Sequence, residues 1–88
     1  MAHALRITET FKARLRSKSS QEMARVLRAM NLLASNPRHP GLRTKKVQNT
    51  QGIFEARVDR GLRMTFEWEA STIVLRNNCK HDDVLGAP

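Results

Sequence analysis

The chain has 88 residues, which is enough for one small domain over residues 1–88 and too few to indicate a second. Its 16 lysines and arginines exceed its 8 acidic residues and give a net charge of +8, which favours an anionic partner such as nucleic acid or an acidic protein. A single cysteine excludes a disulfide framework and a multi-thiolate metal site. Without a signal-peptide core or a long apolar run, we expect a cytoplasmic protein that does not bind membranes.

Most of the positive charge lies in residues 1–50, where the only acidic residues are Glu9 and Glu22. Residues 51–88 are nearly balanced in charge. The basic half of the chain is therefore either a binding surface for a polyanion or a solvated surface without a specific ligand.

The first half of the chain predicts a short strand followed by two helices. Alternation over residues 4–7 predicts the strand, and Thr8 is placed to cap the helix that follows. After a serine-rich break, Ser19 and Glu22 form a capping-box pattern for a second helix, which should stop before Pro37. Apolar residues at helical spacing predict the core-facing side of this helix: Met23, Val26, Leu27, Met30, Leu33 and Ala34.

Residues 52–68 predict a β-hairpin, because apolar and polar side chains alternate on both sides of a glycine-containing turn. A three-residue loop with Gly61 in the left-handed conformation is a common solution for such a hairpin. This loop sets Arg57 directly opposite Arg63 on one face, with Glu55 diagonal to Arg63. The other face is apolar and consists of Phe54, Ala56, Val58, Leu62, Met64 and Phe66.

Residues 44–47 predict a strand before the hairpin, and residues 73–75 predict a final strand after it. Pairing of the final strand with the hairpin buries Trp68 and places Arg76 opposite Thr65, on the face of the other two arginines. Because like charges that face each other destabilise a sheet, three arginines there indicate either neighbouring carboxylates or a bound anion. The predicted order is β-α-α-β-β-β, an α+β fold in which a helical hairpin packs on one face of a small, mostly antiparallel sheet and leaves the arginine face open.

Several features occur together in the chain: this order of elements, the phrase Asn-Pro-Arg-His-Pro-Gly-Leu-Arg over residues 36–43, the two hairpin strands and the terminal His81-Asp82-Asp83. Together they resemble the RelE/ParE superfamily of toxins over essentially the whole chain. The resemblance implies the toxin of a bacterial type II toxin–antitoxin pair, bound by an acidic, partly disordered antitoxin. Contact with operator DNA would occur only through the antitoxin complex.

The resemblance leaves three functions open. RelE-like members are metal-independent endoribonucleases, or mRNA interferases, that use no cofactor and block translation by cutting mRNA on the ribosome. ParE-like members share the fold but inhibit DNA gyrase. The third possibility is an attenuated member that mainly binds its antitoxin. We expect the first of these, with the ribosome and mRNA as partners.

The resemblance also implies roles for individual residues. In this type of cleavage the 2′-hydroxyl of the RNA attacks the adjacent phosphate, so the site needs a base, a cation and an acid. Arg63 matches the arginine that stabilises the phosphate charge, Glu55 matches a general-base glutamate, and His81 matches a C-terminal general-acid histidine. Residues expected to bind RNA phosphates are Arg57, Arg76, Lys45 and Lys46.

Each of these residues also has a simpler interpretation. Arg63 and Glu55 could form a surface ion pair, and the two lysines could be solvated on an edge strand. Strict alternation after Leu75 would turn His81 toward the helices, so its proposed role requires the chain to leave strand geometry at the two asparagines that follow Arg76. The chain has no tyrosine, and Leu85 stands where many relatives have one, so the ribosome would have to supply much of the substrate positioning.

Overall fold

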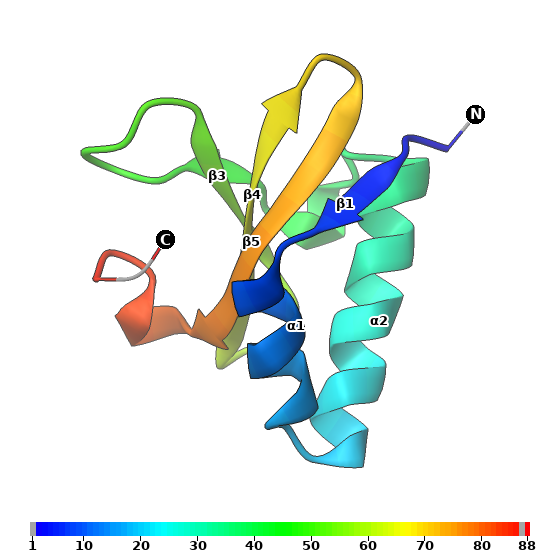
Figure 1. Cartoon of the computed structure of the whole chain (residues 1–88), viewed down its shortest axis with the longest axis vertical. Coiled ribbons are helices and arrows are strands. Elements are labelled where there is room, and N and C mark those ends of the chain that lie inside the picture. The colour runs from blue at the N-terminus through cyan, green and yellow to red at the C-terminus, as the bar shows by residue number, and fades with distance from the viewer. Residues whose placement is uncertain (1, 87) are drawn as a thin grey trace.

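The computed structural model describes residues 2–86 and 88, and it consists of two helices packed on one face of a five-stranded sheet (Figure 1). The elements in chain order are β1 (Leu5–Ile7), α1 (Glu9–Arg16), α2 (Ser20–Ser35), β2 (Lys45–Lys46), β3 (Ile53–Arg57), β4 (Leu62–Glu69) and β5 (Thr72–Lys80), with short 3₁₀ helices at Pro40–Leu42 and His81–Asp83. The α+β prediction is confirmed, and counting the short β2 gives the order β-α-α-β-β-β-β. Neither described helix is long and apolar enough to cross a lipid bilayer.

The strands lie in the order β1-β5-β4-β3-β2, with β1 parallel to β5 and every other pair antiparallel. The core lies between the helices and the sheet. Its fully buried side chains include Phe11, Val26 and Leu33 from the helices and Met64, Phe66, Ile73 and Leu75 from the sheet. We call the sheet face that points away from the helices the outer face.

Both predicted helix caps are present. The Thr8 hydroxyl accepts a hydrogen bond from the Phe11 N–H at 3.2 Å, and the Ser19 hydroxyl accepts one from the Glu22 N–H at 3.2 Å. The Glu22 carboxylate in turn accepts from the Ser19 N–H at 3.3 Å, which completes the capping box. These bonds satisfy N–H groups that have no partner within the helix.

The predicted core stripe of α2 is correct for Val26, Met30 and Leu33 but wrong for Leu27, whose side chain is 44% exposed. Ala29 is buried in its place. The sheet covers the side of α2 where Val26, Ala29 and Leu33 lie, and a helix that packs on a single layer buries only a narrow stripe.

Replacing Ser19 by alanine should lower the free energy of unfolding by about 1 kcal/mol, because the capping box loses the acceptor of one N–H and the anchor of the Glu22 side chain. Urea denaturation followed by circular dichroism measures this change. Ser20→Ala is the matched control, since Ser20 is the first helical residue of α2 and is exposed. An equal loss in both variants would contradict a specific capping effect.

The predicted hairpin register between β3 and β4 is confirmed, with Arg57 opposite Arg63 and Glu55 opposite Thr65. The prediction that Gly61 adopts the left-handed conformation is wrong, since among the described glycines only Gly52 has a positive φ. The carboxylate of Asp59 closes the turn instead, because it accepts from the N–H groups of Gly61 and Leu62 at 2.8 Å each. A side chain that closes the turn in this way removes the need for a left-handed residue.

The pairing of β4 with β5 contains a bulge that the sequence did not predict. The pairs Trp68–Ile73 and Phe66–Leu75 are as expected, but Thr65 lies opposite Asn77, and Arg76 is the extra residue on β5. The expectation that Arg76 faces Thr65 is therefore wrong. A bulge inserts one residue and so reverses the alternation of the side chains that follow it.

The bulge decides which residues of β5 face the helices. Beyond it, Asn78 lies opposite the core residue Met64, and its side-chain amide donates to the Phe11 carbonyl at 3.0 Å. Cys79 lies on the outer face, opposite Arg63. The chain thus keeps strand geometry through Lys80, and His81 no longer has to turn toward the helices.

The outer face is not fully open, contrary to the expectation from the sequence. After β5 the chain turns back over this face, and Val84 packs with Val47 and Cys79 in a second, small apolar cluster. The Thr65 hydroxyl donates to the Pro88 carbonyl at 2.7 Å. The prediction that Trp68 belongs to the core is also wrong, because this side chain is 40% exposed near the end of β4, with ring contacts to His3 and Phe66.

Candidate functional site

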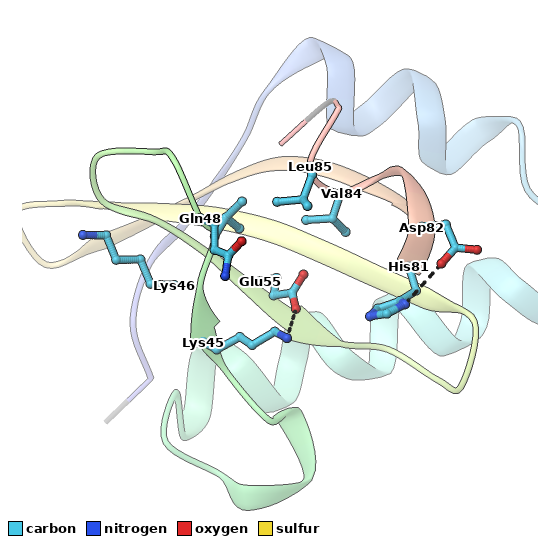
Figure 2. Close-up of a pocket in the computed structure, with 9 residues that line it drawn as sticks. Lys45, Lys46, Gln48, Glu55, His81, Asp82, Val84 and Leu85 are labelled. Carbon is cyan, nitrogen blue, oxygen red and sulfur yellow. Dashed lines mark ion pairs between the residues drawn. The ribbon is translucent and has the colours of Figure 1, made fainter.

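A cavity of about 400 Å³ lies on the outer face between β2, β3 and the C-terminal segment (Figure 2). Its lining residues come from both halves of the chain: Lys45, Lys46, Val47, Gln48, Glu55, His81, Asp82, Val84 and Leu85. Four of the seven site residues expected from the sequence are among them, namely Lys45, Lys46, Glu55 and His81. We call this space the outer cavity.

Glu55 is the buried acid of the outer cavity. It lies in β3 opposite Lys45, with its side chain only 8% exposed, and its Oε1 is 3.3 Å from the Lys45 Nζ. The lysine side chain is 67% exposed. A carboxylate removed from water needs such a counter-charge, whereas an exposed lysine is held only weakly. The Lys45 ammonium group can therefore leave Glu55 and bind another anion.

His81 reaches the outer cavity from the end of β5. Its backbone N–H donates to the Gly61 carbonyl at 2.9 Å, which ties the start of the C-terminal segment to the β3–β4 turn. The imidazole Nδ1 lies 3.5 Å from the Asp82 carboxylate, on the solvent side. Figure 2 shows the imidazole of His81 and the carboxylate of Glu55 on the same side of the sheet, facing a common space.

The three arginines expected from the sequence do not meet in the outer cavity. The Arg63 guanidinium donates to the Asp59 carbonyl at 2.7 Å and the Leu62 carbonyl at 3.0 Å, at the hairpin turn. Arg76 pairs with Glu67 at 2.9 Å. Arg57 lines a separate hollow beside α2. Arg57 and Arg63 lie opposite each other in the sheet, and repulsion between their like charges favours separate binding partners for their guanidinium groups.

The sequence did not single out Val47, Gln48 or Val84 as part of the site. Val47 directly follows the predicted site residue Lys46, and Val84 directly follows the His81-Asp82-Asp83 phrase. Leu85, at the position where relatives have a tyrosine, also lines the cavity, and its side chain is 66% exposed. The cavity therefore has an apolar wall beside its charged groups.

Cys79 lies next to the outer cavity without contributing a reactive thiolate. Burial raises the pKa of its thiol, and the Asp83 carboxylate raises it further. Because the thiolate is the nucleophilic form, this environment disfavours cysteine chemistry. Within the described part of the chain, no three histidine, cysteine, aspartate or glutamate side chains are grouped as a metal site requires. The side chains that line the cavity and can carry charge are Lys45, Lys46, Glu55, His81 and Asp82.

Solved structures share the fold of this chain. The toxin–antitoxin complex RelBE2 from Mycobacterium tuberculosis matches with a TM-score of 0.75 and 22% identity, covering 92% of this chain and 100% of that chain. YafQ from Escherichia coli matches with a TM-score of 0.78 and 13% identity, covering 96% and 99% of the two chains. The archaeal RelE–RelB complex from Pyrococcus horikoshii gives 0.72 and 18%, covering 91% and 96%.

The chain has the RelE/YafQ toxin fold. At these identities the comparison establishes the fold over nearly the whole chain, which confirms the resemblance at that level. No family model and no curated protein matches the sequence. Several of the matched toxins were crystallised with antitoxins, among them YafQ with DinJ.

Proposed function

We propose that this chain is the toxin of a type II toxin–antitoxin system and that it cleaves mRNA on the ribosome without a metal cofactor. The observation that supports this activity is the joint placement of Glu55, His81 and two lysines around the outer cavity of a RelE/YafQ-like fold. A base and an acid on one cavity, with cations beside them, are the groups that transesterification of RNA requires.

Glu55 is the proposed base. Its carboxylate accepts the proton of the RNA 2′-hydroxyl, and the 2′-oxygen then attacks the adjacent phosphorus. Lys45 lies against the same carboxylate, so it can turn its ammonium group to the phosphate oxygens as the proton is taken up. Arg63 is diagonal to Glu55 in the sheet and is the guanidinium we propose for the charge that builds up on the phosphate. For this role its side chain must leave the Asp59 and Leu62 carbonyls and turn toward the outer cavity.

His81 is the proposed acid. It donates a proton to the departing 5′-oxygen, so the upstream fragment ends in a 2′,3′-cyclic phosphate and the downstream fragment begins with a 5′-hydroxyl. Leu85 and Val84 offer an apolar wall for a base in place of the expected tyrosine. Lys46, Arg57 and Arg76 are proposed to bind flanking phosphates.

The proposed partners are mRNA, the ribosome and a cognate antitoxin. The net charge of +8 favours an acidic antitoxin, and binding to operator DNA would occur only through the antitoxin complex. The place of action is proposed to be the cytoplasm, where translating ribosomes are found.

Primer extension across an mRNA during translation in vitro tests the nuclease proposal. The wild-type chain should cut at codon-related positions, and Arg63→Ala should lower the cutting rate by about 10²–10³-fold, the usual effect of losing one charge-stabilising donor. Arg6→Ala is the matched control. Because Arg6 pairs with Glu69 at 2.8 Å and does not line the outer cavity, we expect a change of only a few fold.

The same assay separates the alternative targets. If mRNA stays intact and DNA supercoiling by gyrase is blocked, the chain is a ParE-like inhibitor and not a nuclease. The leucine at position 85, where many relatives have a tyrosine, favours this alternative. Intact mRNA with unaffected gyrase and tight binding to the antitoxin would indicate an attenuated toxin.

A further inference from the structure

Three hollows adjoin one another around the end of the β3–β4 hairpin. The outer cavity is the first, and the second, of about 580 Å³, lies at the hairpin turn and includes Arg60 and Lys80. The third, of about 240 Å³, lies between α2, β3 and the Pro40–Leu42 helix. His81 lines both the first and the second hollow, and Arg25 lines both the second and the third. Because neighbouring hollows share these lining residues, they follow one another around the hairpin, and we call this succession of three hollows the path.

Positive charge dominates the far end of this path. The charged residues that line the third hollow are Arg25, Arg28 and Arg57, over a floor of Ala29, Leu32, Leu42 and Val58. Three guanidinium groups around an apolar floor suit phosphates whose attached bases pack on carbon surface. A phosphate bound here would also offset the positive charge of Arg57, which lies opposite Arg63 in the sheet.

Three acids line the second hollow. Asp82 is almost fully exposed beside His81, whereas the other two bind partners within the protein. Asp59 accepts two backbone N–H groups of the turn and lies 3.4 Å from Arg25, and Glu22 belongs to the capping box of α2. Arg60 and Lys80 are exposed. The second hollow can thus offer cations to a strand that passes from the first hollow to the third.

We propose that single-stranded RNA on the 3′ side of the scissile phosphate follows this path, with Arg60 and Lys80 and then Arg28 and Arg57 as its phosphate ligands. The inference rests on the proposed nuclease function and extends it to the polarity of the substrate. It assigns binding roles to Arg28 on α2, Arg60 at the hairpin turn and Lys80 at the end of β5, none of which lines the outer cavity.

The polarity follows from the proposed roles of Glu55 and His81. The base must stand beside the 2′-hydroxyl of the upstream nucleotide, and the acid must stand beside the 5′-oxygen of the downstream nucleotide. Upstream nucleotides then lie toward Lys45 and Lys46, and downstream nucleotides pass His81 into the second hollow. The reverse direction of the strand would place each of the two groups beside the wrong oxygen.

Salt-dependent binding of a fluorescein-labelled oligouridylate tests the path without requiring cleavage. Removing two phosphate contacts by Arg28→Ala with Arg60→Ala should reduce the slope of log affinity against log salt by about 1.4, at about 0.7 per phosphate of a single strand. Arg16→Ala with Arg38→Ala removes the same charge at positions that line none of the three hollows, and its slope should stay near that of the wild type.

Equal slopes in the two double variants would overturn the path. It would also be overturned if a labelled oligoglutamate lost affinity in Arg28→Ala/Arg60→Ala while the oligouridylate did not, because the hollows would then be a site for an acidic peptide.

Photo-crosslinking tests the polarity. Arg28→Cys, labelled with a benzophenone maleimide in a Glu55→Gln background, should crosslink to mRNA on the 3′ side of the wild-type cut. The matched control is the Glu55→Gln chain without the new cysteine, in which the buried Cys79 is the only thiol. Crosslinks on the 5′ side would overturn the polarity. If the wild type cuts no mRNA, the proposed function and the polarity both fail, while the salt slopes still decide whether RNA occupies the path.

Discussion

Replacing Glu55 by glutamine should lower the rate of mRNA cleavage by about 10²–10⁴-fold, the range expected when a general base is lost. Glutamine keeps the size of the side chain but cannot accept the proton of the 2′-hydroxyl. The fold should persist, because Lys45 is mostly exposed and remains solvated after its partner loses its charge. Primer extension on translated mRNA measures the rate, and circular dichroism checks the fold.

Glu67→Gln is the matched control for this experiment. Glu67 lies on the same face of the sheet and pairs with Arg76, but it does not line the outer cavity. We expect its cleavage rate to stay within a few fold of the wild type. If the Glu55→Gln chain cleaved mRNA at the wild-type rate, Glu55 would not be the general base.

Replacing Phe11 by alanine should lower the free energy of unfolding by about 3–5 kcal/mol, the usual cost of removing a buried phenylalanine. Phe11 is fully buried where α1 meets β5, and its carbonyl is the acceptor for the buried Asn78 side chain. A small domain has about 5–15 kcal/mol in total, so this variant should be close to unfolding at room temperature. Urea denaturation measures the loss.

Leu27→Ala is the control for core packing. This leucine is 44% exposed on α2, and alanine is the better helix former. Its loss should therefore stay below about 1 kcal/mol, which is the hydrophobic contribution of roughly one methylene. A loss as large as that of Phe11→Ala would mean that another surface of the protein covers Leu27 in solution.

The sequence predicted the candidate site in part. Lys45, Lys46, Glu55 and His81 line one cavity, and each was named from its match to the family motifs. Arg63 was named from the same match and Arg76 from the predicted strand register, yet their side chains bind the hairpin turn and Glu67 instead. A motif fixes where a Cα lies, whereas the direction of a long charged side chain depends on which partners the folded chain places within reach.

Local patterns in the sequence determine much of the fold. The caps of both helices involve residues at most three positions apart, so the sequence alone identifies Thr8, Ser19 and Glu22. The register of β3 with β4 is equally local, because a short loop permits only one pairing that keeps Phe54 and Phe66 on the apolar face.

Only the tertiary structure decided the side on which His81 lies. The bulge at Arg76 reverses the alternation of β5, and no local pattern marks it, because it depends on pairing with β4 and on the bond from Asn78 to the Phe11 carbonyl. The fold-back of Val84 onto Val47 and Cys79 is likewise a contact between distant parts of the chain. The sequence thus determined which residues could act in this protein, and long-range packing determined which of them share a cavity.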